Sequence, residues 1–183
     1  VLPHAMGRGH RFSEEQVRGD RFAHHPAKGL KGDLELLQLT KPGAIEERHT
    51  QYLEAGADVI ETNTFSATTI GQHDFLFAGE SKSGRKDEAF FERVINDTDL
   101  VALAHEMNAV AAKIARTAAD RVANETGSPR FVAGALGPLP VTRSLSPDVD
   151  GPRFRPVNSH PLRRASGQQR PRPSAAGASA PRA

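Results

Sequence analysis

The chain has 183 residues and no cysteine, with 24 basic against 22 acidic side chains. Its length fits one ordinary domain. The lack of cysteine excludes disulfides, a nucleophilic thiol and thiolate metal ligands within this chain. No apolar run approaches the roughly 20 residues that span a bilayer, and no signal-like segment opens the sequence. We therefore predict a cytoplasmic protein that does not associate with membranes.

The basic charge is concentrated in residues 161–183, which contain no acid. The arginines of this segment are Arg163, Arg164, Arg170, Arg172 and Arg182. Its Ala, Arg, Pro, Ser and Gly composition predicts a disordered tail, so we divide the chain into a domain over residues 1–158 and a basic tail over residues 159–183. The same composition is typical of a GC-rich coding region read out of frame, which indicates a frameshift near residues 158–161; a genuine low-complexity tail is the alternative.

The first 32 residues show few periodic apolar positions. The chain begins with Val1 and Leu2, as though inside a strand, so we expect its natural start to be missing. A short helix is expected after Ser13, because Glu15 and Gln16 suit a capped first turn. His24 and His25 could suggest a metal site, but adjacent strand residues face opposite ways and no third ligand is suitably spaced.

The next segment has stronger patterns. Leucines over residues 34–39 approach the period of two that is typical of a strand. A helix is predicted from Thr40, with Pro42 in its first turn, to the left-handed stop at Gly56. Residues 58–65 are predicted to form a buried strand whose C-terminal end turns polar.

Three further elements are expected downstream. Residues 76–97 are interpreted as an insertion outside the core, a polar loop followed by a short helix around Phe90. The strongest amphipathic pattern predicts a helix over residues 99–125, closed by Gly127. A strand follows over residues 130–136, and its small residues allow a close approach of backbone or ligand.

The alternation of strands and long crossovers predicts an α/β fold with parallel strands. Periodicity leaves open whether the sheet is doubly wound or closes as a (β/α)8 barrel. In both folds, functional sites gather at the carboxyl ends of the strands, here residues 6–7, 61–65 and 134–138.

Seven segments, taken in order, carry a resemblance to a known family. They are residues 5–7, 18–22, 30–32, 52–58, 60–65, 131–138 and 144–149. With them the chain resembles the N-terminal homocysteine-binding module of cobalamin-dependent methionine synthase, a barrel shared with betaine–homocysteine methyltransferase. The resemblance covers residues 1–158 apart from residues 76–97. It implies a partial (β/α)8 TIM barrel of about the first three β/α units.

The resemblance also implies an activity. In the family, a zinc-bound homocysteine thiolate takes a methyl group from methylcobalamin, which other modules recharge from methyltetrahydrofolate. The family holds its zinc through cysteines near later strands, and this chain has none. We therefore expect a fragment that binds neither zinc nor cobalamin alone, is inactive alone, and depends on the folate and cobalamin modules as partners. Pro3, His4 and Arg8 also stand where the family has Asp, Gly and Thr, which removes a substrate-facing carboxylate.

No catalytic residue and no metal ligand is assigned, but substrate-binding residues are. The candidates are Met6, Gly7, Glu61, Asn63, Thr64, Gly134 and Ala135. Glu61 could hold the homocysteine ammonium or simply accept nearby backbone donors, and Asn63 and Thr64 could line a pocket or cap a turn. Two alternatives remain for Gly134, Ala135 and Gly137. Their small size could let a ligand approach the backbone closely, or it could serve only the tight packing of strand on helix.

Other interpretations remain open at this point. His49 and His105 are expected on helix faces, as packing or surface residues rather than ligands. A rival hypothesis from another class is a non-enzymatic protein whose basic tail binds nucleic acid or another polyanion, although no aromatic residues are interleaved with the arginines. A phosphate-binding barrel enzyme is the third reading, and no glycine-rich phosphate loop supports it.

Overall fold

The computed structural model describes residues 12–26, 29–77 and 86–137. In chain order its elements are α2 (Glu14–Arg18), the 3-10 helix η1 (Leu34–Leu36), α3 (Leu37–Thr40), α4 (Pro42–Glu54), β1 (Val59–Glu61), α5 (Thr69–Leu76), α6 (Glu88–Asn96), α7 (Thr98–Thr126) and β2 (Phe131–Ala133). The predictions for Met6, Gly7, the opening strand and the basic tail lie outside the described residues.

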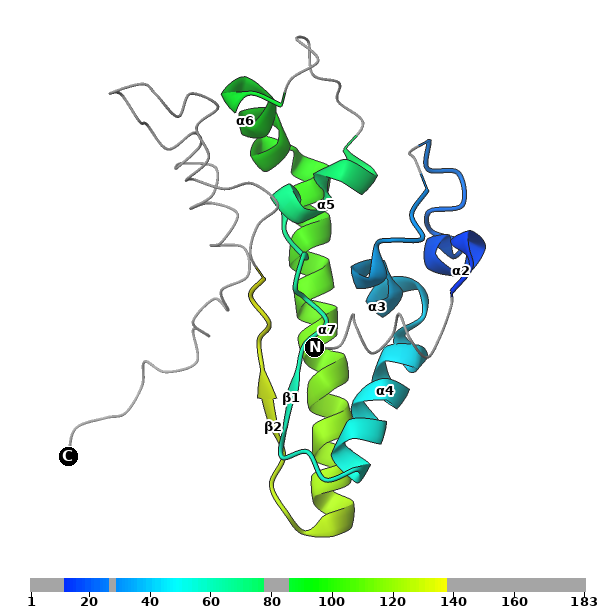
Figure 1. Ribbon diagram of the computed structural model, residues 1–183, viewed down its shortest axis with the longest axis vertical. Helices are drawn as coiled ribbons and strands as arrows, with labels where there is room; N and C mark the ends of the chain where they lie inside the picture. Colours follow the sequence, from blue (N-terminus) through cyan, green and yellow to red (C-terminus); the bar gives the residue numbers. More distant parts are fainter. Residues whose placement is uncertain (1–11, 27–28, 78–85, 138–183) are drawn as a thin grey trace, which may run out of the picture.

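The 29-residue helix α7 is the spine of the fold (Figure 1). It contacts α3, α4, α5, α6 and both strands. Leu100 and Met107, in its first half, join the larger apolar cluster with α3, α5 and α6. Ala118 and Val122, in its second half, join a smaller cluster with α4 and the strands. The small alanine side chains on this face allow strands and helix to pack closely.

The two strands form a parallel sheet in which Val59 pairs with Phe131 and Glu61 with Ala133. This confirms the predicted parallel crossover, which runs from β1 through α7 to β2. Ile60 points toward α4 and α7 and is buried there. Val59 and Phe131, on the opposite face, are 55% and 56% exposed. The described part is therefore a helix-rich α/β arrangement with one covered and one open sheet face.

Local capping explains where the helices begin and end. The Ser13 hydroxyl and the Gln16 side chain form a reciprocal capping box at α2, as predicted. Asp97 accepts from the Leu100 backbone N–H at 2.9 Å and starts α7. Gly127, at φ 68°, ends it in the left-handed conformation that favours glycine. The predicted helices over residues 40–56 and 99–125 are confirmed.

The strand-like pattern over residues 34–39 is wrong as a prediction, because this segment is helical, as η1 and α3. Glu35, Leu36, Leu37 and Gln38 are buried consecutively, which a half-buried strand cannot achieve since its side chains alternate between faces. Helices α2, α4 and α7 pack against this segment from several directions, so four consecutive side chains are buried. Hydrophobic spacing predicts secondary structure only for an element with one buried face, so it fails for this segment.

The interpretation of residues 76–97 as an insertion outside the core is also wrong. Phe90, Phe91, Val94 and Ile95, on α6, are all buried in the larger apolar cluster. They pack there because α6 lies against both α5 and α7. Helix α5 was not predicted, since it buries polar side chains such as Gln72 and has little apolar periodicity.

Candidate functional site

The carboxyl ends of the two strands continue to pair beyond the sheet. The Thr62 backbone N–H donates to the Ala133 carbonyl at 2.9 Å. The Ala135 N–H then donates to the Thr62 hydroxyl at 3.0 Å, and the Thr64 hydroxyl donates to the Ala135 carbonyl at 2.8 Å. Two threonine side chains thus extend the ladder where the strands themselves have stopped.

The direction of the remaining bond in this network follows from proton counting. The Thr62 and Thr64 hydroxyl oxygens lie 2.8 Å apart. Each hydroxyl has one hydrogen, and that of Thr64 goes to Ala135. Thr62 is therefore the donor to Thr64. Both hydroxyls are fully committed to holding the strand ends together, so neither has a hydrogen left for a ligand.

Residues 62–67, here called the strand-end loop, are also fixed by close backbone packing. A Cβ atom on Gly71 of α5 would lie 2.1 Å from the Ser66 carbonyl oxygen. A Cβ on Gly137 would lie 2.3 Å from the Phe65 carbonyl oxygen. Only glycine allows these approaches without a shift of the backbone. Gly137 therefore makes a tight packing contact, whereas Gly134 faces open space.

Hydrogen bonds to η1 and α7 also hold this loop. The Asn63 amide donates to the Leu34 carbonyl at 2.9 Å. The Ser66 backbone N–H donates to the Glu35 carboxylate at 3.0 Å. The Asn108 amide, from α7, donates to the Ala67 carbonyl at 2.7 Å. The loop is thus held by η1, α5 and α7 at once, and its conformation depends on all of them.

Among the predicted binding residues, Glu61 has the most accessible functional group. It is exposed at the end of β1, and its carboxylate forms no hydrogen bond or ion pair with another described residue. With His49 and Tyr52 of α4, it lines a cavity of about 340 Å³ whose walls also include Val59 and Ala133. A free carboxylate at the mouth of a partly apolar cavity can hold an ammonium group.

The other predicted residues that the structure describes do not join Glu61 in that cavity. Asn63 and Thr64 are buried and serve the loop through the bonds described above. Ala135 is half-buried and takes part in the strand-end ladder, and Gly134 is exposed. Turn and strand-end fixation, rather than ligand contact, accounts for Asn63 and Thr64 in this structure.

The helix histidines lie in different surroundings. His49 is fully buried between α4 and β1, and its ring nitrogens have no hydrogen-bond partner among the described residues. Burial lowers the pKa of His49 to about 4, so its imidazole is neutral at pH 7. His105 is exposed on α7. His49 is therefore a packing residue that also lines the cavity.

Sequence reasoning missed two buried carboxyl groups beneath the strand-end loop, Asp33 and Glu35. Burial, and next the charge of Glu35, raises the pKa of Asp33 to about 8. Burial also raises the pKa of Glu35, and the hydrogen bond from the Ser66 N–H works in the opposite direction. The signal that could have found them is two acids within a run of leucines, where a solvated charge is not expected.

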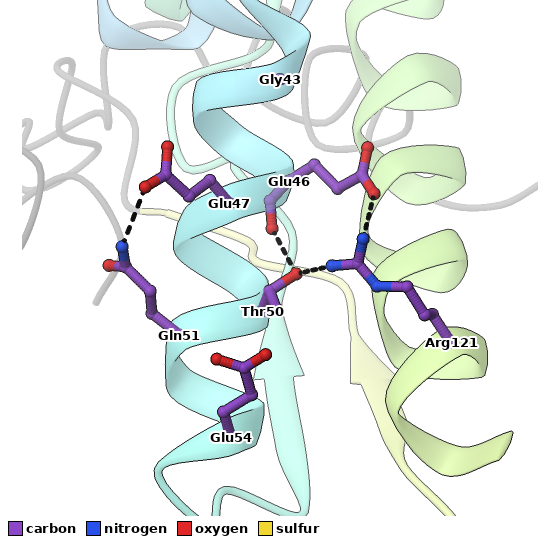
Figure 2. Close-up of a pocket in the computed structure, with 7 residues that line it drawn as sticks. All are labelled: Gly43, Glu46, Glu47, Thr50, Gln51, Glu54 and Arg121. Carbon is purple, nitrogen blue, oxygen red and sulfur yellow. Dashed lines mark hydrogen bonds and ion pairs between the residues drawn. The ribbon is translucent and has the colours of Figure 1, made fainter. Parts of the chain in front are cut away.

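A second concave surface lies between α4 and α7 (Figure 2). Its lining is acidic on the α4 side, with Glu46, Glu47 and Glu54. Arg121 reaches across from α7 to Thr50 and, at 3.5 Å, to Glu46. These bonds tie the two helices together at the surface. They account for Glu46, Thr50 and Arg121 without a ligand.

The residues present do not fit a zinc site of the kind that the resemblance implies. The chain has no cysteine at all. Within residues 12–26, 29–77 and 86–137, no three His, Asp or Glu side chains converge to hold a metal ion. His24 and His25 lie in the turn after α2, with the His25 ring edge-on to Phe22 at 6.4 Å. No catalytic step in this chain is therefore assigned to a metal.

The fold and the strand-end arrangement define a protein of the α/β class whose candidate site lies at the carboxyl ends of parallel strands. The family model described as homocysteine S-methyltransferase matches residues 10–165. The chain belongs to the homocysteine S-methyltransferase family. In the part of the chain that the structure describes, no helix has both the length and the apolar character needed to cross a membrane.

Proposed function

We propose that this chain supplies part of the homocysteine-binding site of a cobalamin-dependent methionine synthase. The reaction of such an enzyme transfers a methyl group from methylcobalamin, recharged from methyltetrahydrofolate, to the sulfur of homocysteine. Membership of the homocysteine S-methyltransferase family supports homocysteine as the substrate. The barrel-type arrangement and the domain division at residues 158 and 159 belong to the same proposal.

The observation that carries the proposal is the free carboxylate of Glu61 at the end of β1. Glu61 would bind the substrate ammonium through a charge-assisted hydrogen bond. The neighbouring wall of Val59 and Ala133 would contact the apolar carbons of homocysteine. The strand-end loop contributes by fixing the direction of Glu61 rather than by direct contact.

The chemical role of this chain is accordingly binding and orientation. A thiol becomes an effective nucleophile at neutral pH when it is held as a thiolate. The described residues provide no group suited to that task, so activation of the sulfur is assigned to residues outside the described part of the chain. We expect homocysteine binding by this chain and no methyl transfer by it alone.

Calorimetric titration of the full chain with L-homocysteine under reducing conditions tests this function. Glu61→Gln should weaken binding by about tenfold or more, because it removes a charged hydrogen bond worth roughly 1.5–3 kcal/mol. Glu54→Gln is the matched control, since Glu54 is an exposed carboxylate on α4 away from the strand ends. It should leave binding unchanged.

A second ligand separates the ammonium contact from the rest of the site. The compound 4-mercaptobutyrate lacks only the amino group of homocysteine, so Glu61→Gln should not weaken its binding. Equal weakening for both ligands would contradict the assigned role of Glu61. The absence of homocysteine binding to the unaltered chain would refute the proposed function itself.

A further inference from the structure

Two buried acids lie in the turn that leads into η1, directly beneath the strand-end loop. Asp33 is fully buried, and Glu35 is 7% exposed. The carbonyl of Leu34, between them, accepts the Asn63 amide at 2.9 Å. The turn and the loop are thus in direct contact at both side chain and backbone.

Both polar backbone groups of Ser66 connect to the pair. Its N–H donates to the Glu35 carboxylate at 3.0 Å. Its carbonyl accepts from the Gln72 amide at 3.1 Å, and the same amide nitrogen donates to Asp33 at 3.2 Å. A change of charge in the pair therefore affects both backbone groups of Ser66, the N–H through Glu35 and the carbonyl through Gln72.

The two carboxyl groups cannot easily be ionised together, because they are close and poorly solvated. With its pKa near 8, Asp33 holds the proton at neutral pH. Glu35 then accepts the Ser66 N–H, whereas the Oδ2 atom of Asp33 is buried with no hydrogen-bond partner among the described residues, so a proton on Asp33 avoids an unpaired buried charge. This arrangement needs one proton for the pair.

Charged groups on the neighbouring elements have partners of their own. On α2, Glu14 pairs with Arg18 at 2.6 Å and also accepts from the Leu30 and Lys31 backbone N–H groups. On α5, Asp74 pairs with Lys86, whose amine also lies 3.1 Å from the His73 ring. Glu35 is the charged group that acts on Asp33.

We propose that Asp33 and Glu35 are a positioning pair that holds one proton, on Asp33, and, through Ser66, keeps the strand-end loop in the conformation that supports substrate binding at Glu61. The pair acts through the loop and does not touch the substrate. Loss of this proton leaves two buried negative charges in the same turn, and the turn must open to hydrate them. The loop then loses the contacts made by Ser66 and Asn63. The link to substrate, though not the link to the loop, rests on the proposed homocysteine function.

The direct test follows Ser66 by carbon-detected NMR of the full chain from pH 6 to pH 9.5. The Ser66 ¹⁵N shift and the Glu35 carboxyl carbon should change together with a midpoint near pH 8. Asp33→Asn keeps the shape of protonated Asp33 and its ability to donate, and it should abolish the inflection. A merely structural role for Asp33 would not produce a shared titration.

A second variant guards against loss of folding in the first. Glu35→Gln keeps an acceptor for Ser66 and removes the charge that acts on Asp33, so the midpoint should move to lower pH. The pair is overturned if the unaltered chain shows no inflection at Ser66, if the inflection persists in Asp33→Asn, or if the midpoint is unchanged in Glu35→Gln.

Homocysteine affinity gives the functional readout. The ratio of Kd between the unaltered chain and Asp33→Asn, measured at the same pH, cancels the ionisation of the ligand itself. The ratio should be near one at pH 6.5 and rise to about tenfold at pH 9, where only about a tenth of the chain would keep the proton. A ratio that does not change with pH overturns the role in binding. If neither protein binds homocysteine, the proposed function fails, while the Ser66 titration still decides the loop coupling.

Discussion

The Thr64 hydroxyl donates to the Ala135 carbonyl at 2.8 Å, and this bond joins two segments at the carboxyl ends of the parallel strands. The two partners come from opposite sides of the long α7 crossover. The contact is buried at Thr64, so water does not readily replace it. Removal of this bond therefore tests how much the pairing of the strand ends contributes to stability.

Thr64→Val should lower the free energy of unfolding by about 1–3 kcal/mol, because it leaves the Ala135 carbonyl without its donor and the hydrogen of the buried Thr62 hydroxyl without its acceptor. The measurement is urea denaturation followed by circular dichroism. Thr126→Val is the matched control, since the Thr126 hydroxyl bonds only within its own helix at an exposed end. It should change stability by less than about 0.5 kcal/mol. Equal effects would mean that the strand-end ladder does not contribute as described.

Two glycines in helices give predictions of opposite sign. Gly71→Ala should destabilise the protein by about 1–3 kcal/mol, because the new methyl group would overlap the Ser66 carbonyl. Gly43→Ala, in α4, has nothing within 4 Å of the new methyl group and should stabilise by up to about 1 kcal/mol through helix propensity. Thermal unfolding of both variants tests the close approach of α5 to the strand-end loop. Similar shifts of Tm in the two variants would contradict it.

Burial of neutral His49 predicts a loss of stability in acid. The unfolded chain takes up a proton near pH 6.5, whereas the folded chain resists protonation down to about pH 4. Stability is therefore fully present above pH 6.5 and falls by about 1.4 kcal/mol per pH unit as the pH is lowered toward 4. Asp33 acts with the opposite sign in this range, so the contribution of His49 must be isolated by difference.

The difference is the stability of the unaltered chain minus that of His49→Leu, measured by urea denaturation at intervals from pH 7 to pH 4.5. It should decrease steadily below pH 6.5, because leucine has no proton to gain. A flat difference would show that His49 protonates freely in the folded state.

The Arg21 guanidinium forms two hydrogen bonds with the Glu106 carboxylate, at 2.6 and 2.7 Å, and links the turn after α2 to α7. Both side chains are largely exposed, so solvent and salt screen the pair. A double-mutant cycle with Arg21→Ala and Glu106→Ala should give a coupling of less than about 1 kcal/mol that shrinks at 1 M salt. A coupling insensitive to salt would indicate that the pair is less hydrated than its exposure suggests.

The sequence by itself determined the elements whose ends are set by neighbouring residues. Pro42 and Gly56 bound α4, and Asp97 and Gly127 bound α7, because a cap or a left-handed stop acts within one helical turn. The parallel crossover followed from the length of the α7 segment, since only a long connection returns a strand in the same direction. The family could also be assigned from the sequence, because its motifs are contiguous stretches of sequence.

The tertiary structure alone decided which of these residues act together. Asp33 and Glu35 become a coupled pair only because Ser66 and Gln72 lie over them, and no local rule relates segments so far apart in the chain. Thr64 was a candidate for ligand contact until its hydroxyl was found to be committed to Ala135. Spacing records which side of an element is apolar, whereas the partner of a buried polar group depends on which distant segment packs against it.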